Sequence, residues 1–248
     1  MKASKKLSVI TASYNSEYTI SRTIESILEQ SYTNIEYIIV DGASNDQTLS
    51  IIDKYRKHIL DKVISFKLLS ERDNGIADAW NKGLQFATGE VIFFLNSDDW
   101  IEYDSISKAM RNFEQNGNMV LYGRCNRYNV EEFLVGSYQK RFFRGRELWN
   151  FGFSFTTCFI GSEVFDKLGG FNSDFKIAID SEFLLRCIKN KVKFLKGDHT
   201  VNMREGGVSL NHRDLARQEF RSALLKYGYP SFLVNLIDKI QKKIKKFN

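Results

Sequence analysis

The sequence predicts an α/β protein with a mostly parallel central sheet flanked by helices. Short strands alternate with amphipathic helical segments through the first hundred residues. The segment at 90–95 is apolar at nearly every position, which is typical of a strand buried on both faces of a parallel sheet. Polar clusters follow several of the strands, as expected where the carboxyl ends of parallel strands meet at one edge of a sheet.

The alternating part begins with a strand at 7–14 and a helix at 16–30, in which Ile20, Ile24 and Ile27 recur at helical spacing. A β-branched strand is predicted next, and a polar turn then leads into the following helix. The predicted order from there is strand 35–40, helix 48–55, strand 63–69, helix 76–87 and strand 90–95.

The pattern becomes less regular after Trp100. The expected elements are a helix at 104–115, strands near 119–124 and 133–139, an aromatic-rich segment at 142–159 and a helix at 181–188. We assign this half of the chain to substrate recognition, with a contribution from the aromatic-rich segment.

Residues 233–248 are predicted to form a basic amphipathic helix. Its apolar face comprises Leu233, Leu236, Ile237, Ile240, Ile244 and Phe247, and its basic face Lys239, Lys242, Lys243, Lys245 and Lys246. Such a helix fits an anionic membrane surface, where each basic residue contributes about 1 kcal/mol. The alternative is a helix packed on its own domain. The concentration of charge at one end of a chain of pI 9.1 favours the membrane, and Pro230 is expected to mark the end of the globular part.

Composition excludes several classes of protein. The 248 residues carry 36 Lys and Arg against 30 Asp and Glu, a net charge of +6, and 43% are hydrophobic, which excludes a disordered chain. The longest apolar run, 91–95, is far shorter than the about 18 residues that a membrane span needs. Polar residues interrupt the apolar segment after the basic N-terminus, so it is interpreted as a strand rather than a signal peptide. No nucleic-acid partner is expected, because the sequence contains no recognised binding module.

The three cysteines are widely spaced and predict neither a disulfide framework nor a paired zinc motif, so a reducing cytosol is expected. Cys158 and Cys187 are expected to pack in the core. The three histidines also lack metal-ligand spacing, which leaves His199 and His212 outside any metal site. A metal would then be held mainly by carboxylates, which favours Mg²⁺ or Mn²⁺.

The strongest chemical signal is the pair Asp98 and Asp99 at the end of a buried strand. Adjacent carboxylates repel each other, and a divalent cation that also binds diphosphate oxygens would compensate them. The alternative is a solvated turn before the next helix.

Asp41 ends another strand at the same edge, where it could accept a hydrogen bond from a uracil imide or a ribose hydroxyl. The alternative for Asp41 is a turn aspartate before Gly42.

Asp180 precedes Glu182 and Arg186, which are four residues apart and can pair along a helix. Spacing alone favours Asp180 as the N-cap of that helix. The functional interpretation is a general base, which needs a carboxylate within hydrogen-bond reach of an acceptor hydroxyl.

Taken together, six ordered motifs resemble the family-2 glycosyltransferases. They are Leu7-Ser-Val-Ile-Thr-Ala-Ser-Tyr-Asn15, Tyr37-Ile-Ile-Val-Asp41-Gly-Ala-Ser-Asn-Asp-Gln-Thr48, Asp73-Asn-Gly-Ile-Ala-Asp78-Ala-Trp-Asn-Lys-Gly83, Leu95-Asn-Ser-Asp98-Asp99, Gly169-Gly-Phe171 and Ile179-Asp180-Ser-Glu182. The resemblance covers about residues 7–210, and so many ordered motifs make chance agreement very improbable.

The resemblance implies a GT-A fold, an inverting transfer from a nucleotide-diphosphate sugar, with UDP favoured by family analogy, and Mn²⁺ or Mg²⁺ under the diphosphate. It implies base recognition by Asp41 and a metal motif in which Asp99 contacts the metal and Asp98 lies near the metal, the ribose or the sugar. It implies Asp180 as the catalytic base. Further positions that match donor-binding parts of the family are Thr11, Ser13, Tyr14, Asp73 and Asp78.

The resemblance also divides the chain by role: a nucleotide-sugar-binding half at 1–100, an acceptor-binding and catalytic-base half at 101–212, and a basic helical tail at 213–248. Many bacterial members act on lipid-diphosphate-linked sugars at the inner face of the cytoplasmic membrane, in surface-polysaccharide biosynthesis. The expected donor is therefore a UDP-hexose or UDP-N-acetylhexosamine, and the expected acceptor a saccharide or lipid-linked saccharide. The expected location is cytoplasmic and peripheral at that membrane.

Three positions depart from the family pattern: Ala12 replaces a common Pro, Ile179 replaces a Glu before the base, and Arg204 stands where many members carry His. Arg cannot bind a metal cation, but it can pair with a diphosphate. We therefore expect Arg204 to stabilise the leaving diphosphate, and Gly206 and Gly207 to let this loop close over the donor.

Two other functions remain open. A sugar nucleotidyltransferase would share a similar sheet, but its Gly-rich basic loop after the first strand is absent from 12–17. A non-catalytic membrane-attached scaffold would keep the fold without turnover. The joint retention of Asp41, Asp98, Asp99 and Asp180 argues against such a scaffold.

Overall fold

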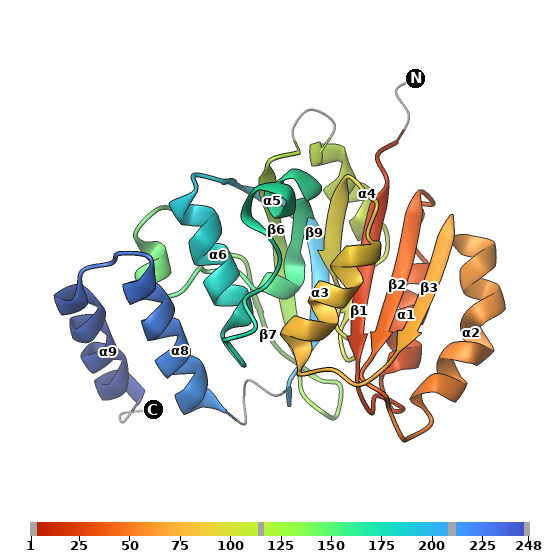
Figure 1. Cartoon of the computed structure of the whole chain (residues 1–248), viewed down its shortest axis with the longest axis horizontal. Coiled ribbons are helices and arrows are strands. Elements are labelled where there is room, and N and C mark those ends of the chain that lie inside the picture. Colours follow the sequence, from red (N-terminus) through yellow and green to blue (C-terminus); the bar gives the residue numbers. More distant parts are fainter. Residues whose placement is uncertain (1–3, 114–116, 208–211, 246–248) are drawn as a thin grey trace.

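The computed structural model describes residues 4–113, 117–207 and 212–245. Its strands form one mixed sheet (Figure 1). The strand order is β3-β2-β1-β4-β8-β6-β9-β5, with β7 paired to β6. The strands are β1 Leu7–Ser13, β2 Ile35–Asp41, β3 Ser65–Ser70, β4 Val91–Phe94, β5 Trp100–Ile101, β6 Met119–Tyr128, β7 Leu134–Tyr138, β8 Cys158–Gly161 and β9 Lys193–Arg204. The helices are α1 Ile20–Leu28, α2 Thr48–Lys62, α3 Ile76–Phe86, α4 Ser105–Met110, α5 Ser162–Leu168, α6 Ile179–Lys189, α8 Arg213–Lys226 and α9 Ser231–Lys245, with short 3₁₀ turns η1 Arg111–Phe113, η2 Arg146–Leu148 and η3 Phe155–Thr157.

The N-terminal part of the sheet is parallel. Strand β1 pairs in parallel with β2 and β4, and β3 pairs in parallel with β2. All four residues of β4 are buried, as their apolar sequence predicts. The alternating arrangement predicted for the first hundred residues is therefore confirmed.

The second half of the sheet is mixed and was only partly predicted. Strand β8 runs antiparallel to both β4 and β6, while β9 runs parallel to β6 and antiparallel to β5. The prediction omitted β5, β8, β9 and α5, and it included α8 only within the helical tail at 213–248. Strand β8 is only four residues long, and the apolar alternation of β9 is interrupted by Lys196, Gly197 and Asp198.

Helices cover both faces of the sheet. Apolar side chains of α1, α2 and α4 pack on one face with Leu7 and Val9 of β1. Those of α3, α5 and α6 pack on the other face with Ile10 of β1. Several predicted helix ends were wrong: α1 begins at Ile20 rather than at 16, α2 continues to Lys62 rather than ending at 55, and α4 ends at Met110 before a 3₁₀ turn.

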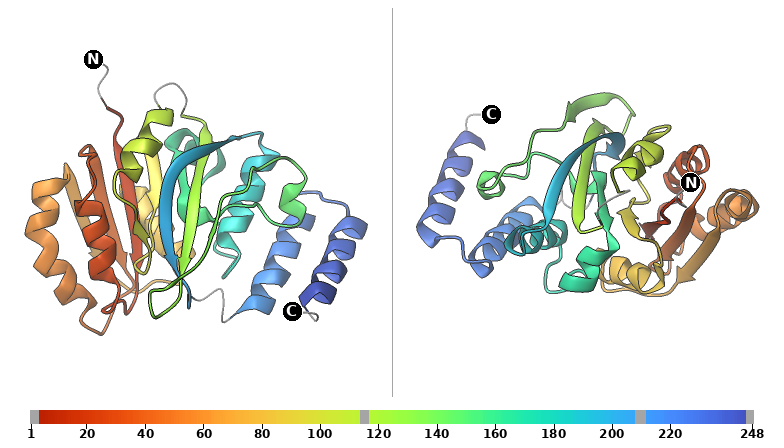
Figure 2. Two further views of the ribbon diagram at one scale, coloured as in Figure 1. Left: turned by 180° about the vertical axis from the view of Figure 1, so that it is seen from behind. Right: turned by 90° about the horizontal axis from the view of Figure 1, so that it is seen from above.

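The last two helices form a hairpin at the opposite end of the molecule from α2 (Figure 2). Val234 of α9 is buried against the domain, and Arg217 of α8 pairs with Asp238 of α9 at 2.6 Å. The expectation that the globular part ends at Pro230 is therefore wrong, because α9 packs on α8 after it.

Among the described residues, the structure contains no helix with both the length and the apolar character needed to cross a membrane.

Candidate active site

The carboxyl ends of the parallel strands meet at one edge of the sheet, as predicted. The strand register places Asp41 between Ser13 of β1 and Ser70 of β3. The loop after β1 also contacts the loop after β4, because the hydroxyls of Ser16 and Ser97 lie 2.7 Å apart. The three polar clusters found in the sequence therefore converge.

Asp41 holds two of these loops together. Its buried carboxylate accepts hydrogen bonds from the Ser44 N–H at 2.9 Å, the Ser44 hydroxyl at 2.5 Å and the Ser70 hydroxyl at 2.8 Å. The Ser44 hydroxyl in turn accepts the Asn15 N–H at 2.8 Å. The sequence analysis predicted no role in the site for Ser44, Ser70 or Asn15. The three bonds to Asp41 leave one of the about four acceptor positions of the carboxylate, on Oδ1.

Tyr14 and Asp73 approach the backbone at Gly42. A Cβ atom at Gly42 would lie 2.6 Å from Oδ2 of Asp73 and 3.3 Å from Cδ2 of Tyr14, so a side chain at this position would collide with Asp73. The Tyr14 side chain is 62% exposed, which leaves its ring open to a planar ligand. The structure therefore brings Tyr14, Asp41 and Asp73 together.

Other predicted donor-binding residues differ in their surroundings. The buried Ser13 hydroxyl has no hydrogen-bond partner among the described residues, so a ligand could satisfy it. Thr11 points into the core instead, with its hydroxyl 3.2 Å from that of Tyr37. Asp78 accepts the Asn74 N–H at 3.0 Å and lies 3.6 Å from the Lys82 ammonium, so it stabilises the start of α3.

Asp99 is held in a fixed orientation. It is 2% exposed, and its Oδ2 accepts the Thr156 hydroxyl at 2.6 Å while its Oδ1 accepts the Arg204 N–H at 3.2 Å. Burial, and secondly the charge of Asp98, raise its pKa well above the ordinary value. Thr156 was missed by the sequence analysis, because no local pattern connects η3 to the end of β4.

Asp98 is half-buried, and its Oδ2 faces the backbone at Gly207, where a Cβ would lie 3.9 Å away. Burial raises its pKa, whereas its own backbone N–H and the charge of Arg204 lower it. The two adjacent carboxylates thus place negative charge where water solvates it poorly. Carboxylate oxygens are hard ligands, which suit Mg²⁺ or Mn²⁺. Within the described ranges, no group of three or more His, Cys, Asp or Glu residues is placed to hold a metal.

Asp180 lies in the first turn of α6, whose N-cap is Ala178, so the N-cap interpretation of Asp180 is wrong. Its Oδ1 accepts the Ser181 N–H at 2.6 Å, and burial raises its pKa. Burial, and secondly the charge of Asp180, raise the pKa of the Cys158 thiol. The Phe155 ring of η3 lies 6.3 Å from that of Phe183 in α6, so the short segment that bonds Asp99 through Thr156 also packs on the helix that carries Asp180. The predicted pair of Glu182 and Arg186 is confirmed at 3.1 Å.

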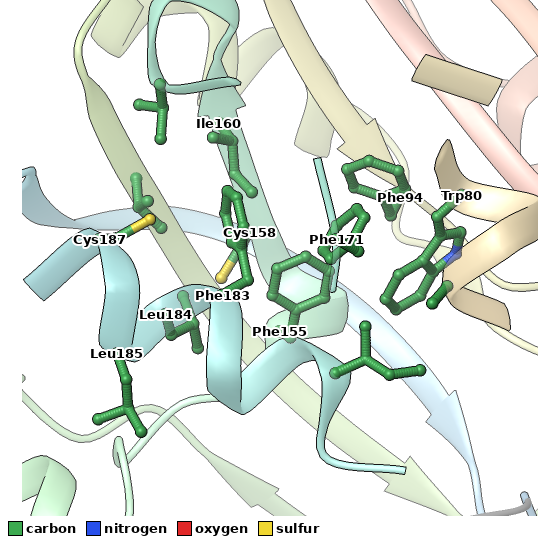
Figure 3. Close-up of a cluster of buried hydrophobic side chains, with 14 of the residues drawn as sticks. Trp80, Phe94, Phe155, Cys158, Ile160, Phe171, Phe183, Leu184, Leu185 and Cys187 are labelled. Atoms are coloured by element: carbon green, nitrogen blue, oxygen red, sulfur yellow. The ribbon is translucent and has the colours of Figure 1, made fainter. Parts of the chain in front are cut away.

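An aromatic cluster supports this segment (Figure 3). The Trp80 ring lies 5.2 Å from Phe94, 5.4 Å from Phe155 and 4.8 Å from Phe171, measured between centroids. Trp80 is buried and packs in the core. Four phenylalanines of the aromatic-rich segment are also buried and unavailable to a substrate: Phe151, Phe153, Phe155 and Phe159.

Two of the sequence motifs meet through Asn81 and Phe171. The Asn81 side chain donates to the Phe171 carbonyl at 2.9 Å and accepts its N–H at 2.7 Å. A Cβ at Gly170 would lie 2.3 Å from Asn81 Oδ1, which explains the need for glycine there. This contact fixes α3 to the segment that leads towards Asp180.

The Arg204 guanidinium lies on the turn after β6. It donates to the Val130 carbonyl at 2.9 Å and pairs with Glu132 at 3.6 Å. Gly206 adopts a positive φ of 116°, which glycine favours. Residues 208–211, the rest of the loop expected to close over the donor, lie outside the described residues.

The sequence of this chain is similar to those of known proteins. The family described as "Glycosyl transferase family 2" matches residues 8–177. The UDP-Glc:alpha-D-GlcNAc-diphosphoundecaprenol beta-1,3-glucosyltransferase WfaP of Escherichia coli is 31% identical over 221 residues, which cover 86% of this chain and 83% of that protein. The putative glycosyltransferase EpsH of Bacillus subtilis is 36% identical over 120 residues, which cover 48% of this chain and only 33% of EpsH.

Similar folds occur among solved structures. The mannosyltransferase PcManGT from Pyrobaculum calidifontis, in complex with GDP-Man and Mn²⁺, superposes with a TM-score of 0.68 at 18% identity, over 91% of this chain and 64% of that one. An alignment at this identity establishes the fold alone. The family match over residues 8–177 shows that the chain belongs to glycosyltransferase family 2, and the structural match shows that it has the GT-A fold.

Proposed function

We propose that this glycosyltransferase moves a hexose or N-acetylhexosamine from a UDP-sugar to a hydroxyl of a saccharide acceptor, with inversion at the anomeric carbon, in bacterial surface-polysaccharide biosynthesis. One observation carries the proposal: η3 bonds Asp99 through Thr156, and through Phe155 it packs on Phe183 of α6, the helix that carries Asp180 in its first turn. A donor diphosphate and an acceptor hydroxyl can therefore be held by neighbouring groups.

The donor would bind at the carboxyl ends of β1, β2 and β4. Tyr14 offers an exposed ring beside Gly42 and Asp73, and Ser13 offers a buried hydroxyl without a partner among the described residues. UDP is favoured because the E. coli relative is named as a UDP-glucose enzyme. GDP is the alternative nucleotide, since the structurally similar mannosyltransferase was solved with GDP-Man.

Asp98 and Asp99 would hold a divalent cation, Mn²⁺ or Mg²⁺. When bound, such a cation supplies positive charge next to the leaving diphosphate. The orientation of Asp99 by Thr156 and the Arg204 backbone supports this role, because outer partners of this kind fix a ligand carboxylate.

Asp180 would act as the general base. It takes the proton from the acceptor hydroxyl as the oxygen attacks the anomeric carbon from the face opposite the diphosphate. The new glycosidic C–O bond forms while the bond to the phosphate oxygen breaks, and its electron pair leaves with UDP. One displacement inverts the configuration, so a nucleophilic side chain is not required.

Arg204 would stabilise the negative charge on the leaving diphosphate. Its charge already acts on Asp98, and its backbone N–H bonds Asp99, so the residue adjoins the carboxylate pair. The guanidinium would have to leave Glu132 and the Val130 carbonyl to reach a phosphate. Full UDP affinity and full turnover in Arg204→Ala would contradict this role.

The acceptor is proposed to be a lipid-diphosphate-linked saccharide, met at the inner face of the cytoplasmic membrane. The E. coli relative is named for such an acceptor. On α9, Phe232, Leu236 and Ile240 are 69%, 52% and 40% exposed and follow one another at four-residue spacing, so they share a face. Helix α9 runs towards the molecular edge at which the parallel strands end (Figure 1). A membrane bound there would bring lipid-linked acceptors towards the site.

Binding calorimetry with purified protein and Mn²⁺ tests the proposal, first against UDP, GDP and TDP and then against UDP-sugars. We expect metal-dependent UDP binding that is lost in Asp99→Ala. Incubation with a UDP-sugar and a lipid-diphosphate-linked saccharide should then release UDP. Absence of nucleotide binding with metal present would favour the non-catalytic scaffold.

A further inference from the structure

A carboxylate that is not among the predicted site residues holds the segment that leads into Asp180. Glu219 of α8 accepts hydrogen bonds from the backbone N–H groups of Lys176, Ile177 and Ala178, each at 2.8 Å. These three amides are consecutive and end at the N-cap of α6. Hydrogen bonds to an ionised carboxylate are stronger than those between neutral groups, so the contact fixes this backbone firmly.

The start of α6 needs such a partner. The first N–H groups of a helix lack intrahelical acceptors, and a negative charge complements the helix dipole there. The N-cap residue, Ala178, has no side chain that could accept, and the Asp180 carboxylate is already bonded to the Ser181 N–H. From 41 residues away, Glu219 satisfies one of these N–H groups, that of the N-cap Ala178, together with the two amides before it.

Helix α8 is itself well anchored. Lys226 at its C-terminal end lies 3.7 Å from the buried Glu182 of α6, and Tyr227 donates a hydrogen bond to the same carboxylate. Helices α8 and α9 are joined by the pair of Arg217 and Asp238. Glu219 itself lies on α8, beyond the residues 8–177 that match the family.

We propose that Glu219 is a positioning residue, which places Asp180 relative to the acceptor hydroxyl through the backbone of 176–178. The inference rests on the proposed role of Asp180 as the base. Displacing a catalytic group by about 1 Å can lower the rate about 100-fold. We expect Glu219→Ala to lower kcat about 10- to 100-fold. The KM for the donor should change less than about twofold, because the hydrogen bonds of Glu219 within the described residues go to 176–178 and not to the donor loops after β1, β2 and β4.

The experiment compares Glu219→Ala and Glu219→Gln with Asp238→Asn as the matched control. Asp238 of α9 pairs with Arg217 of α8 and with Lys242 of its own helix, and within the described residues it makes no hydrogen bond or ion pair with 176–178. For each variant we would measure kcat, the donor KM, UDP binding and hydrogen exchange of the 176–178 amides. The expected result is a fall in kcat and faster exchange in Glu219→Ala, an intermediate effect in Glu219→Gln, which keeps one acceptor oxygen, and neither effect in Asp238→Asn.

The possible failures are distinguishable. If the wild-type protein transfers no sugar, the proposed function fails and the positioning role fails with it. If the wild-type protein transfers sugar but Glu219→Ala keeps full kcat, the positioning role alone is wrong. An equal loss of kcat in Glu219→Ala and Asp238→Asn would also overturn it, because the effect would then be general destabilisation of the C-terminal helices.

Discussion

Thr156 donates its hydroxyl to Oδ2 of Asp99 at 2.6 Å, although 57 residues separate the two in the sequence. The second oxygen of Asp99 accepts the Arg204 backbone N–H at 3.2 Å. The plane of the carboxylate is therefore set by η3 and β9 together, and neither donor supplies a charged group that would compete with a cation. Neutral donors of this kind orient a metal ligand without neutralising it.

Replacing Thr156 should weaken metal binding. Thr156→Val keeps the shape of the side chain but removes the donor, and loss of such an outer partner typically costs about 10- to 100-fold in metal affinity. Thr156→Ser should retain most of the affinity. Calorimetric titration of Mn²⁺ in the presence of UDP measures the effect. The matched control is Thr157→Val: its buried hydroxyl bonds Ser154 and Gly123 rather than the site, so Mn²⁺ affinity should not change.

Replacing Asp180 should abolish turnover without loss of the donor. Asp180→Asn cannot accept the acceptor proton, and general-base catalysis contributes about 10²- to 10⁴-fold to a rate. We expect kcat to fall by that factor while UDP affinity stays at the wild-type value. Turnover close to wild type in Asp180→Asn would show that another group accepts the proton.

The rate of the wild-type enzyme should depend on pH in the way expected of a general base at Asp180. A general base works only when it is deprotonated, so activity is lost as the pH falls through its pKa. Burial raises the pKa of Asp180, and the acid limb of kcat/KM should therefore lie above the about 3.9 expected of an ordinary aspartate. A pH–rate profile measured with saturating metal checks this, and a limb at or below the ordinary value would contradict it.

Many residues of the proposed donor site were predictable, because the sequence patterns that indicate them are local. Buried β-branched strands and the polar residues that follow them indicate where parallel strands end, and Asp41, Asp98 and Asp99 follow from that pattern. The partners of these aspartates were not predictable. Ser70 reaches Asp41 from a neighbouring strand and Thr156 reaches Asp99 from η3, and both contacts depend on strand pairing that periodicity does not encode.

The second half was less predictable for a related reason. Strands β8 and β9 lack clear alternation, and the register of β9 against β6 shifts between Tyr122 and Arg124, where Gly123 lies against the His199 ring. The role of Glu219 depends on how α8 packs beside α6, and nothing in the sequence around Asp180 indicates it. The aromatic-rich segment was assigned to substrate recognition, but its central phenylalanines complete the core.

His199 should make stability depend on pH. It is fully buried, with Nε2 2.7 Å from the Thr157 carbonyl, and burial lowers its pKa to about 4. Between that value and 6.5 the unfolded chain binds a proton that the folded protein does not, so the free energy of unfolding falls as the pH falls. The contribution amounts to about 3 kcal/mol. Urea unfolding of the wild type and of His199→Gln, which keeps a donor for Thr157, should isolate it, and equal pH dependence in both proteins would contradict the prediction.

Membrane binding should depend on the exposed face of α9. The double variant Leu236→Ser and Ile240→Ser removes two exposed apolar side chains, and burying each in a bilayer interface is worth about 1 kcal/mol or more. We expect this variant to bind vesicles that contain phosphatidylglycerol at least about tenfold more weakly in a sedimentation assay. Binding of the wild type should also weaken as the salt concentration rises, because salt screens the attraction between the anionic lipids and basic residues such as Lys239. The matched control is Leu60→Ser with Ile64→Ser, two exposed apolar residues at and just after the end of α2, at the opposite end of the molecule (Figure 2). Equal loss in both double variants would mean that binding is non-specific, and wild-type binding in the α9 variant would show that this helix does not form the membrane contact.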